Sequence, residues 1–133
     1  MARKKEYLSP SEWEIMNVIW DLGGKPTVKN VVDTAYPDGE KAYTTVHTIM
    51  DILIDKGFLK KEKFGPINLY PPLRKRTEAV RKETDIFINK VFGGSFQKMA
   101  NFMLETRKLS EEEYEYLKNL IENKEKKSGE KDK

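Results

Sequence analysis

Residues 41–72 read KAYTTVHTIMDILIDKGFLKKEKFGPINLYPP, and this stretch decides the fold. Its first half predicts a helix from about Lys41 to Lys56, which Gly57 ends. Four apolar residues recur at positions i, i+3, i+4 and i+7 and predict one buried stripe: Val46, Ile49, Met50 and Leu53. The second half turns at Gly65-Pro66 between two short apolar runs, which predicts a β-hairpin that Pro71-Pro72 ends.

Two shorter helices are predicted before this stretch. Ser9 and Glu12 form a capping box at the start of the first, and Gly23-Gly24 ends it. Thr27 can cap the second helix, over residues 28–36. Three helices followed by a hairpin are the order of a winged helix-turn-helix domain, whose second helix of the turn unit lies in the DNA major groove. The sequence therefore predicts a DNA-binding domain over residues 1–73.

The face opposite the buried stripe of the third helix is rich in β-branched residues, which are poor helix formers. Threonine hydroxyls and an imidazole can bond to base edges, and a threonine methyl can pack on thymine. The alternative is that these threonines are merely tolerated on a surface. Basic clusters on the hairpin and at the N-terminus can contact phosphates. The predicted DNA-binding residues are Thr44, Thr45, His47, Thr48 and Asp51 on the helix, Lys60, Lys61 and Lys63 on the hairpin, and Arg3 and Lys4 at the N-terminus.

Composition excludes several classes of function. The 133 residues contain no cysteine and one histidine, which argues against disulfides, a catalytic thiol and a metal site within one chain. Residues 1–73 hold ten Lys/Arg and ten Asp/Glu, so the net charge of +3 is weak evidence for any partner. There is no phosphate-binding glycine loop, no signal peptide and no run of membrane-spanning length. We expect a cytoplasmic protein that is not an enzyme and needs no cofactor.

The remaining chain predicts three more helices, over about residues 75–92, 96–106 and 111–124. Ser95 can cap the second of them, and Ser110 with Glu113 forms a capping box before the third. Residues 74–122 are predicted to form a dimerisation domain, because their apolar faces are too wide for so small a bundle to cover. The alternative is that these helices fold back on the N-terminal domain of the same chain. The predicted dimer residues are Val80, Phe87, Ile88, Val91, Phe96, Met99, Met103, Leu117, Leu120 and Ile121. The charged tail, residues 123–133, is expected to be disordered.

Four segments carry a resemblance to a known family. They are LSPSEWEIMNVIWDLG (8–23), TTVHTIMDILIDKGFLKKEK (44–63), INLYPPL (67–73) and FINKVFGGSFQKMANF (87–102). Over residues 7–122 the chain resembles the BlaI/MecI/CopY family of penicillinase and methicillin-resistance repressors. The resemblance implies a homodimeric, cytoplasmic transcriptional repressor with a winged-helix N-terminal domain and a helical dimerisation domain. Members bind dyad operators, often with TACA/TGTA half-sites, and usually repress drug-resistance or metal-homeostasis genes.

The resemblance also implies a way of inactivation. In the penicillinase branch a membrane sensor protease triggers cleavage of the repressor at an Asn-Phe bond, and the matching residues here are Asn101 and Phe102. The alternative is that Phe102 is an ordinary side chain of an amphipathic helix. The copper-responsive branch binds metal through cysteines, which this sequence lacks. Asp51 and Asp55 lie on or near the DNA-facing side, where this chain is less basic than several members, so the operator sequence stays open.

Two other functions remain possible from the residues alone. A winged helix can serve as a protein–protein interaction module, and the formally neutral N-terminal half keeps that alternative open. A regulator can also sense a small ligand between its domains. Binding to DNA that weakens steeply with salt distinguishes a DNA-binding domain from a protein-only surface.

Overall fold

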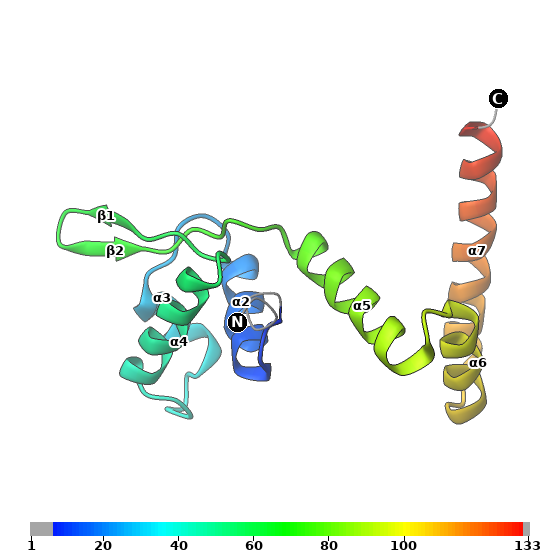
Figure 1. Ribbon diagram of the computed structural model, residues 1–133, viewed down its shortest axis with the longest axis horizontal. Coiled ribbons are helices and arrows are strands. Elements are labelled where there is room, and N and C mark those ends of the chain that lie inside the picture. The colour runs from blue at the N-terminus through cyan, green and yellow to red at the C-terminus, as the bar shows by residue number, and fades with distance from the viewer. Residues whose placement is uncertain (1–6, 132–133) are drawn as a thin grey trace. The chain divides into compact units, whose positions relative to one another are not determined.

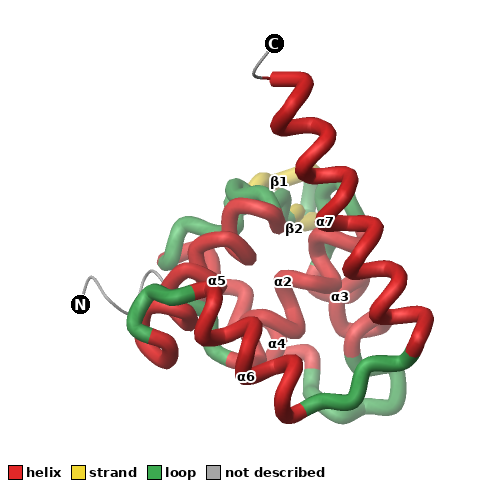
Figure 2. The backbone as a smooth tube through the Cα atoms, turned by 90° about the vertical axis from the view of Figure 1, so that its right-hand side faces the viewer, coloured by secondary structure: helices red, strands yellow, loops and turns green. Residues whose placement is uncertain are grey.

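The computed structural model describes residues 7–131, which form two compact units that divide between Asp85 and Ile86. The described part is mainly helical with one small antiparallel sheet, so the predicted fold class is confirmed (Figures 1 and 2). None of its helices is long and apolar enough to cross a membrane. The elements are α2 Pro10–Leu22, α3 Val28–Ala35, α4 Tyr43–Asp55, β1 Glu62–Phe64, β2 Ile67–Leu69, α5 Arg76–Phe92, α6 Phe96–Thr106 and α7 Glu111–Lys131.

Helices α2 and α3 begin where the sequence predicts, because local side chains bond their first free amides. The Ser9 hydroxyl accepts from the Glu12 amide at 3.2 Å, and the Glu12 carboxylate accepts from the Ser9 amide at 2.9 Å. Thr27 and Asn30 form the same reciprocal pair at the start of α3, at 3.1 and 2.9 Å. Gly23 ends α2 with φ at 70°, a left-handed conformation that favours glycine.

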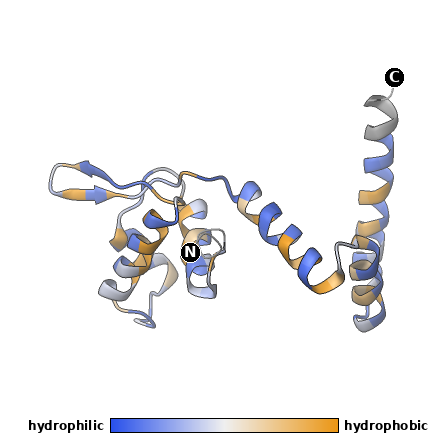
Figure 3. Ribbon diagram, in the orientation of Figure 1, coloured by the Kyte–Doolittle hydropathy of each residue, from blue (hydrophilic) through white to orange (hydrophobic). Residues whose placement is uncertain are grey.

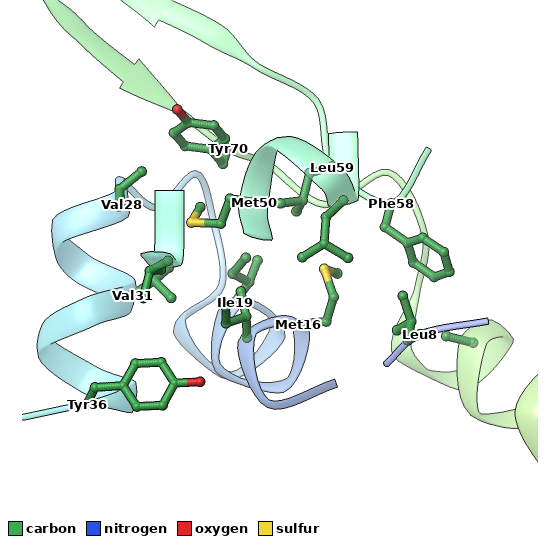
Figure 4. Packing of buried hydrophobic residues seen from close by; sticks show 14 residues of the cluster. Leu8, Met16, Ile19, Val28, Val31, Tyr36, Met50, Phe58, Leu59 and Tyr70 are labelled. Atoms are coloured by element: carbon green, nitrogen blue, oxygen red, sulfur yellow. The ribbon is translucent and has the colours of Figure 1, made fainter. Parts of the chain in front are cut away.

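Helix α4 packs its predicted stripe into the core of the first unit. Val46, Met50 and Leu53 are fully buried, and Ile49 is partly buried against the same cluster. They meet residues of α2 and α3, of which Ile15, Ile19 and Val31 are also fully buried (Figure 4). Each fully buried aliphatic side chain stabilises the fold by roughly 1.5–3 kcal/mol. This packing holds α4 in one rotational setting despite its poor intrinsic helix propensity.

The wing is the hairpin of β1 and β2, as predicted. Glu62 pairs with Leu69, Lys63 with Asn68, and Phe64 with Ile67. Gly65 makes the turn with φ at 61°. The base of the hairpin is fixed to the segment between α2 and α3, because the amide of Tyr70 donates to the carbonyl of Pro26 at 2.8 Å.

The start of α5 belongs to the winged-helix unit, so the predicted domain end at residue 73 differs from the division after Asp85. The Trp20 indole donates to the carbonyl of Arg74 at 2.9 Å, and Ala79 is buried in the core. The Arg76 guanidinium donates to the Asn17 carbonyl at 2.9 Å and to the Asp21 carboxylate at 2.6 Å. These bonds span more than fifty residues, and periodicity in the sequence cannot show them.

The second unit contains the end of α5, with α6 and α7. The predicted caps are present, since Ser95 accepts from the amide of Lys98, and Ser110 and Glu113 bond reciprocally. Apolar residues are interspersed with polar ones along these helices (Figure 3). The expectation of a disordered tail from residue 123 is wrong, because α7 continues to Lys131. Glutamate and lysine are good helix formers, and Glu122 and Lys126 have the i, i+4 spacing that supports a solvated helix.

A buried ion pair joins the end of α4 to the start of α2. The Lys56 ammonium, at the end of α4, lies 2.6 Å from the Glu12 carboxylate in the first turn of α2. It also donates to the carbonyl of Tyr7 at 2.9 Å. The Glu12 and Lys56 side chains are only 8% and 16% exposed, so each charge depends on the other.

We therefore expect Lys56→Met to lower the free energy of unfolding by roughly 3 kcal/mol, because it leaves the Glu12 carboxylate buried without its cation. Urea denaturation of the purified protein measures this change. The matched control is Lys29→Met, which breaks a pair with Asp33 whose side chains are 77% and 61% exposed. That variant should keep the wild-type midpoint. A wild-type midpoint for Lys56→Met would contradict the prediction.

Candidate nucleic-acid interface

The outward face of α4 carries the residues that the sequence predicts for base contact. Thr44, Thr45 and Thr48 are exposed, and the side chains of His47 and Asp51 are 39% and 47% exposed. This placement follows from the buried stripe, because residues half a helical turn away from a buried side chain face outward. The roles of these residues in DNA binding stay a prediction.

Two of these side chains have a polar neighbour within the helix. The Thr48 hydroxyl donates to the carbonyl of Thr44 at 3.0 Å, which leaves its oxygen as an acceptor. His47 Nδ1 lies 3.6 Å from an Asp51 carboxylate oxygen, so the other ring nitrogen, Nε2, is the one available to a partner.

The first turn of α4 contains a residue that the sequence analysis missed. Tyr43 is 54% exposed, and its ring stacks on that of His47 with centroids 6.4 Å apart and planes 6° from parallel. Ala42, at the N-cap, provides no side-chain acceptor, in contrast to Ser9 and Thr27 before α2 and α3. The first amides of α4 are thus left without a side-chain cap. An exposed aromatic residue beside an uncapped start was the signal in the sequence.

The wing presents lysines of unequal availability. Lys60, Lys61 and Lys63 are all exposed. Glu62 lies between them and pairs with Lys25 at 2.9 Å and with Lys60 at 3.6 Å. The hydrogen bond from Lys25 is the main reason why the pKa of Glu62 is lowered, so this carboxylate stays ionised at neutral pH. Lys61 and Lys63 have no ion pair within the described residues and are the wing cations open to a phosphate.

Two further basic residues, Arg74 and Arg76, are occupied by contacts inside the first unit. Arg3 and Lys4 lie outside the described residues. Arg74 stacks over the ring of Phe58 at 4.4 Å, and Arg76 over the ring of Trp20 at 5.5 Å, so both guanidinium groups serve internal contacts. The site therefore depends on α4 and the wing. Within the described residues there is no cluster of three or more histidine, cysteine, aspartate or glutamate side chains that could hold a metal ion.

A cavity of about 330 Å³ lies where the start of α3, the first turn of α4 and the wing meet. Val28 borders it from α3, Tyr43 and His47 from α4, and Asn68 from the wing. Tyr70, at the base of the wing, completes the lining, although its side chain is only 1% exposed. Because three separate elements form this cavity, no local sequence pattern could have predicted it.

The residues predicted to form a dimer are largely uncovered in the single chain. Most are more than a third exposed, and Ile88 and Met99 are half-buried. Helix α6 buries none of its side chains. Asn101 and Phe102 lie in the middle of α6, where Phe102 is 55% exposed. The centroid of its ring lies 6.0 Å from that of Phe92.

Comparison with known proteins identifies the family. The family model described as penicillinase repressor matches residues 8–123. The methicillin resistance regulatory protein MecI of Mammaliicoccus sciuri is 30% identical over 93% of this chain and all of that protein. The penicillinase repressor of Staphylococcus aureus is 28% identical over 91% of this chain and 95% of that protein. A probable transcriptional regulator from Pseudomonas aeruginosa aligns at a TM-score of 0.46 with 14% identity, over 71% of this chain and 73% of its own. The chain belongs to the penicillinase repressor family, whose members are regulators and not enzymes.

Proposed function

We propose that the protein is a homodimeric, cytoplasmic transcriptional repressor that binds a dyad-symmetric operator. The outward face of α4 contacts base edges, and the wing contacts the phosphate backbone. The observation that carries this proposal is the orientation of α4, whose inner residues Val46, Met50 and Leu53 are fully buried while three threonines of its first two turns stay exposed. The family relationship supports a function in repressing resistance genes.

The charge distribution fits a contact that is local to α4 and the wing. Residues 1–73 are formally neutral, so long-range attraction to DNA is weak. Lys61 and Lys63 can each neutralise a phosphate, while Glu62 limits the contribution of Lys25 and Lys60. Such a surface favours binding that depends on base contacts over binding to any DNA.

A second copy of the chain is the proposed cover for the apolar faces of α5, α6 and α7. Phe96 is 68% exposed and Ile121 is 61% exposed, which is unfavourable for a monomer in water. Pairing through these helices would present two recognition helices to the two halves of a palindrome. Linking two half-sites in one dimer raises the effective concentration of the second contact by a large factor.

Cleavage between Asn101 and Phe102 is the proposed means of release. The bond lies within α6, so a cut separates Phe102 and all of α7 from the DNA-binding unit. Local opening must precede the cut, because a protease needs an extended substrate. The proposed trigger is a membrane sensor protease, and the support for it is the family relationship together with the Asn-Phe pair.

Replacing Thr44 by alanine tests base contact by α4. We expect Thr44→Ala to cost roughly 1–3 kcal/mol of binding free energy on the operator and little on unrelated DNA, because a base contact carries sequence information. Fluorescence anisotropy with both DNAs measures the two affinities. Thr84→Ala, on the exposed surface of α5, is the matched control and should bind as the wild type does. Equal losses on both DNAs would contradict base contact by Thr44.

Replacing Glu62 by glutamine tests the electrostatics of the wing. We expect Glu62→Gln to bind operator and unrelated DNA more tightly, since Lys25 and Lys60 then become available to phosphates. The slope of log affinity against log salt should steepen by about one unit for each lysine that gains a phosphate. Glu111→Gln makes the same charge change in α7 and is the control for net charge. An unchanged salt slope for Glu62→Gln would place the wing away from the DNA.

A designed cut tests both the dimer and its release. A foreign protease site that replaces the residues around 101–102 should, once cut, turn a dimer into monomers and lower operator affinity by about 10²–10⁴. Analytical ultracentrifugation and anisotropy measure the two effects, and the same site appended after Lys133 is the control. A cut protein that stays dimeric and bound would refute this means of release. Absence of the native fragment in cells treated with a β-lactam would instead point to another signal.

A further inference from the structure

The hydroxyl of Tyr70 is buried without a hydrogen-bond partner. Its residue is 1% exposed, and it is the one such buried side-chain atom among the described residues. Figure 4 shows this hydroxyl at the edge of the core, near the start of α3 and directed away from the other labelled side chains. A buried hydroxyl without a partner destabilises a fold, and a phenylalanine would fill the same space without that penalty. The presence of this hydroxyl is therefore better explained by a function than by stability.

The start of α3 provides further donors beside the same cavity. Thr27 satisfies two amides of the first turn, because its hydroxyl accepts from Asn30 at 3.1 Å and its carbonyl from Val31 at 3.2 Å. The amides of Val28 and Lys29 have no acceptor among the described residues. The positive end of the helix dipole also lies here, so the position favours an anion.

The other polar groups around the cavity are consistent with an anionic ligand. Asn68 can donate through its side-chain amide, and Lys29 brings a positive charge that Asp33 shares at 2.8 Å. The opposing carboxylates are Asp33 and Asp51, each already beside a basic group. Burial, followed by the charge of Asp51 and the proximity of Tyr43, raises the pKa of Tyr70. Its hydroxyl consequently keeps its proton at neutral pH and can donate it.

We propose that this cavity holds one backbone phosphate of the operator, with the Tyr70 hydroxyl and the first amides of α3 as donors. The inference rests on the proposed function and adds a contact outside the recognition helix and the wing lysines. Tyr43 and Lys29 border the cavity and are exposed, so rotation of surface side chains admits the phosphate oxygen. A phosphodiester fits because it offers only acceptors to a set of donors. The contact fixes the position of α4 in the groove and carries no sequence information itself.

Replacing Tyr70 by phenylalanine tests the contact, since it removes one oxygen and keeps the ring. We expect Tyr70→Phe to weaken binding to operator and to unrelated DNA alike, by about tenfold, with a urea midpoint no lower than that of the wild type. The matched control is Tyr36→Phe, which removes a hydroxyl that contacts Glu14 at 3.4 Å at the other end of α3. That variant should bind both DNAs as the wild type does. Wild-type affinity for Tyr70→Phe would overturn the inference.

A scan of the operator with single methylphosphonates identifies the phosphate. At one position in each half-site, neutralising the phosphate should weaken the wild type and leave Tyr70→Phe unaffected. If every position costs the variant as much as the wild type, the cavity does not hold a DNA phosphate, and a free small anion becomes the alternative ligand. If the wild type prefers the operator and Tyr70→Phe binds with the same affinity as the wild type, this inference is refuted and the proposed function is not. A wild-type protein without preference for any operator refutes the proposed function itself.

Discussion

The packing of α4 against α2 and α3 is the constraint on which the candidate interface depends. Val46, Met50 and Leu53 are fully buried, and a helix with one buried stripe has only one stable rotation about its axis. Thr44 and Thr48 are exposed as a consequence. The cost of placing β-branched residues on a helix surface is offset by the core on the opposite side.

Electrostatics at this interface is governed by local pairs more than by net charge. Glu62 forms ion pairs with Lys25 and Lys60, and Asp51 lies beside His47. Each carboxylate lowers the attraction of its basic neighbours for phosphate, so the proposed interface offers fewer free cations than the sequence contains. Fewer free cations are useful in a repressor, because phosphate contacts raise the affinity for DNA of any sequence. Base contacts are what distinguish the operator from other DNA.

The winged-helix unit also includes the first turns of α5. Trp20 donates to the carbonyl of Arg74, and Arg76 bonds to α2 through Asn17 and Asp21. The helix that leads toward the proposed dimer residues is thereby fixed to the DNA-binding unit at its start. This anchorage is a physical reason why separating the chain after residue 73 would expose part of the core, since Ala79 belongs to it.

The sequence by itself determined the order of the elements, the capping residues Ser9, Thr27, Ser95 and Ser110, and the inner and outer faces of α4. These features depend on residues within one or two helical turns, where spacing and side-chain chemistry act locally. It did not determine the helical continuation of α7 to Lys131, because a highly charged composition is typical both of a solvated helix and of a disordered tail. Only the tertiary structure decided that Arg74 and Arg76 serve internal contacts, that Glu62 occupies two lysines, and that Tyr70 borders a cavity with α3 and α4. Each of these joins segments far apart in the chain, and such contacts arise only when separate elements pack together.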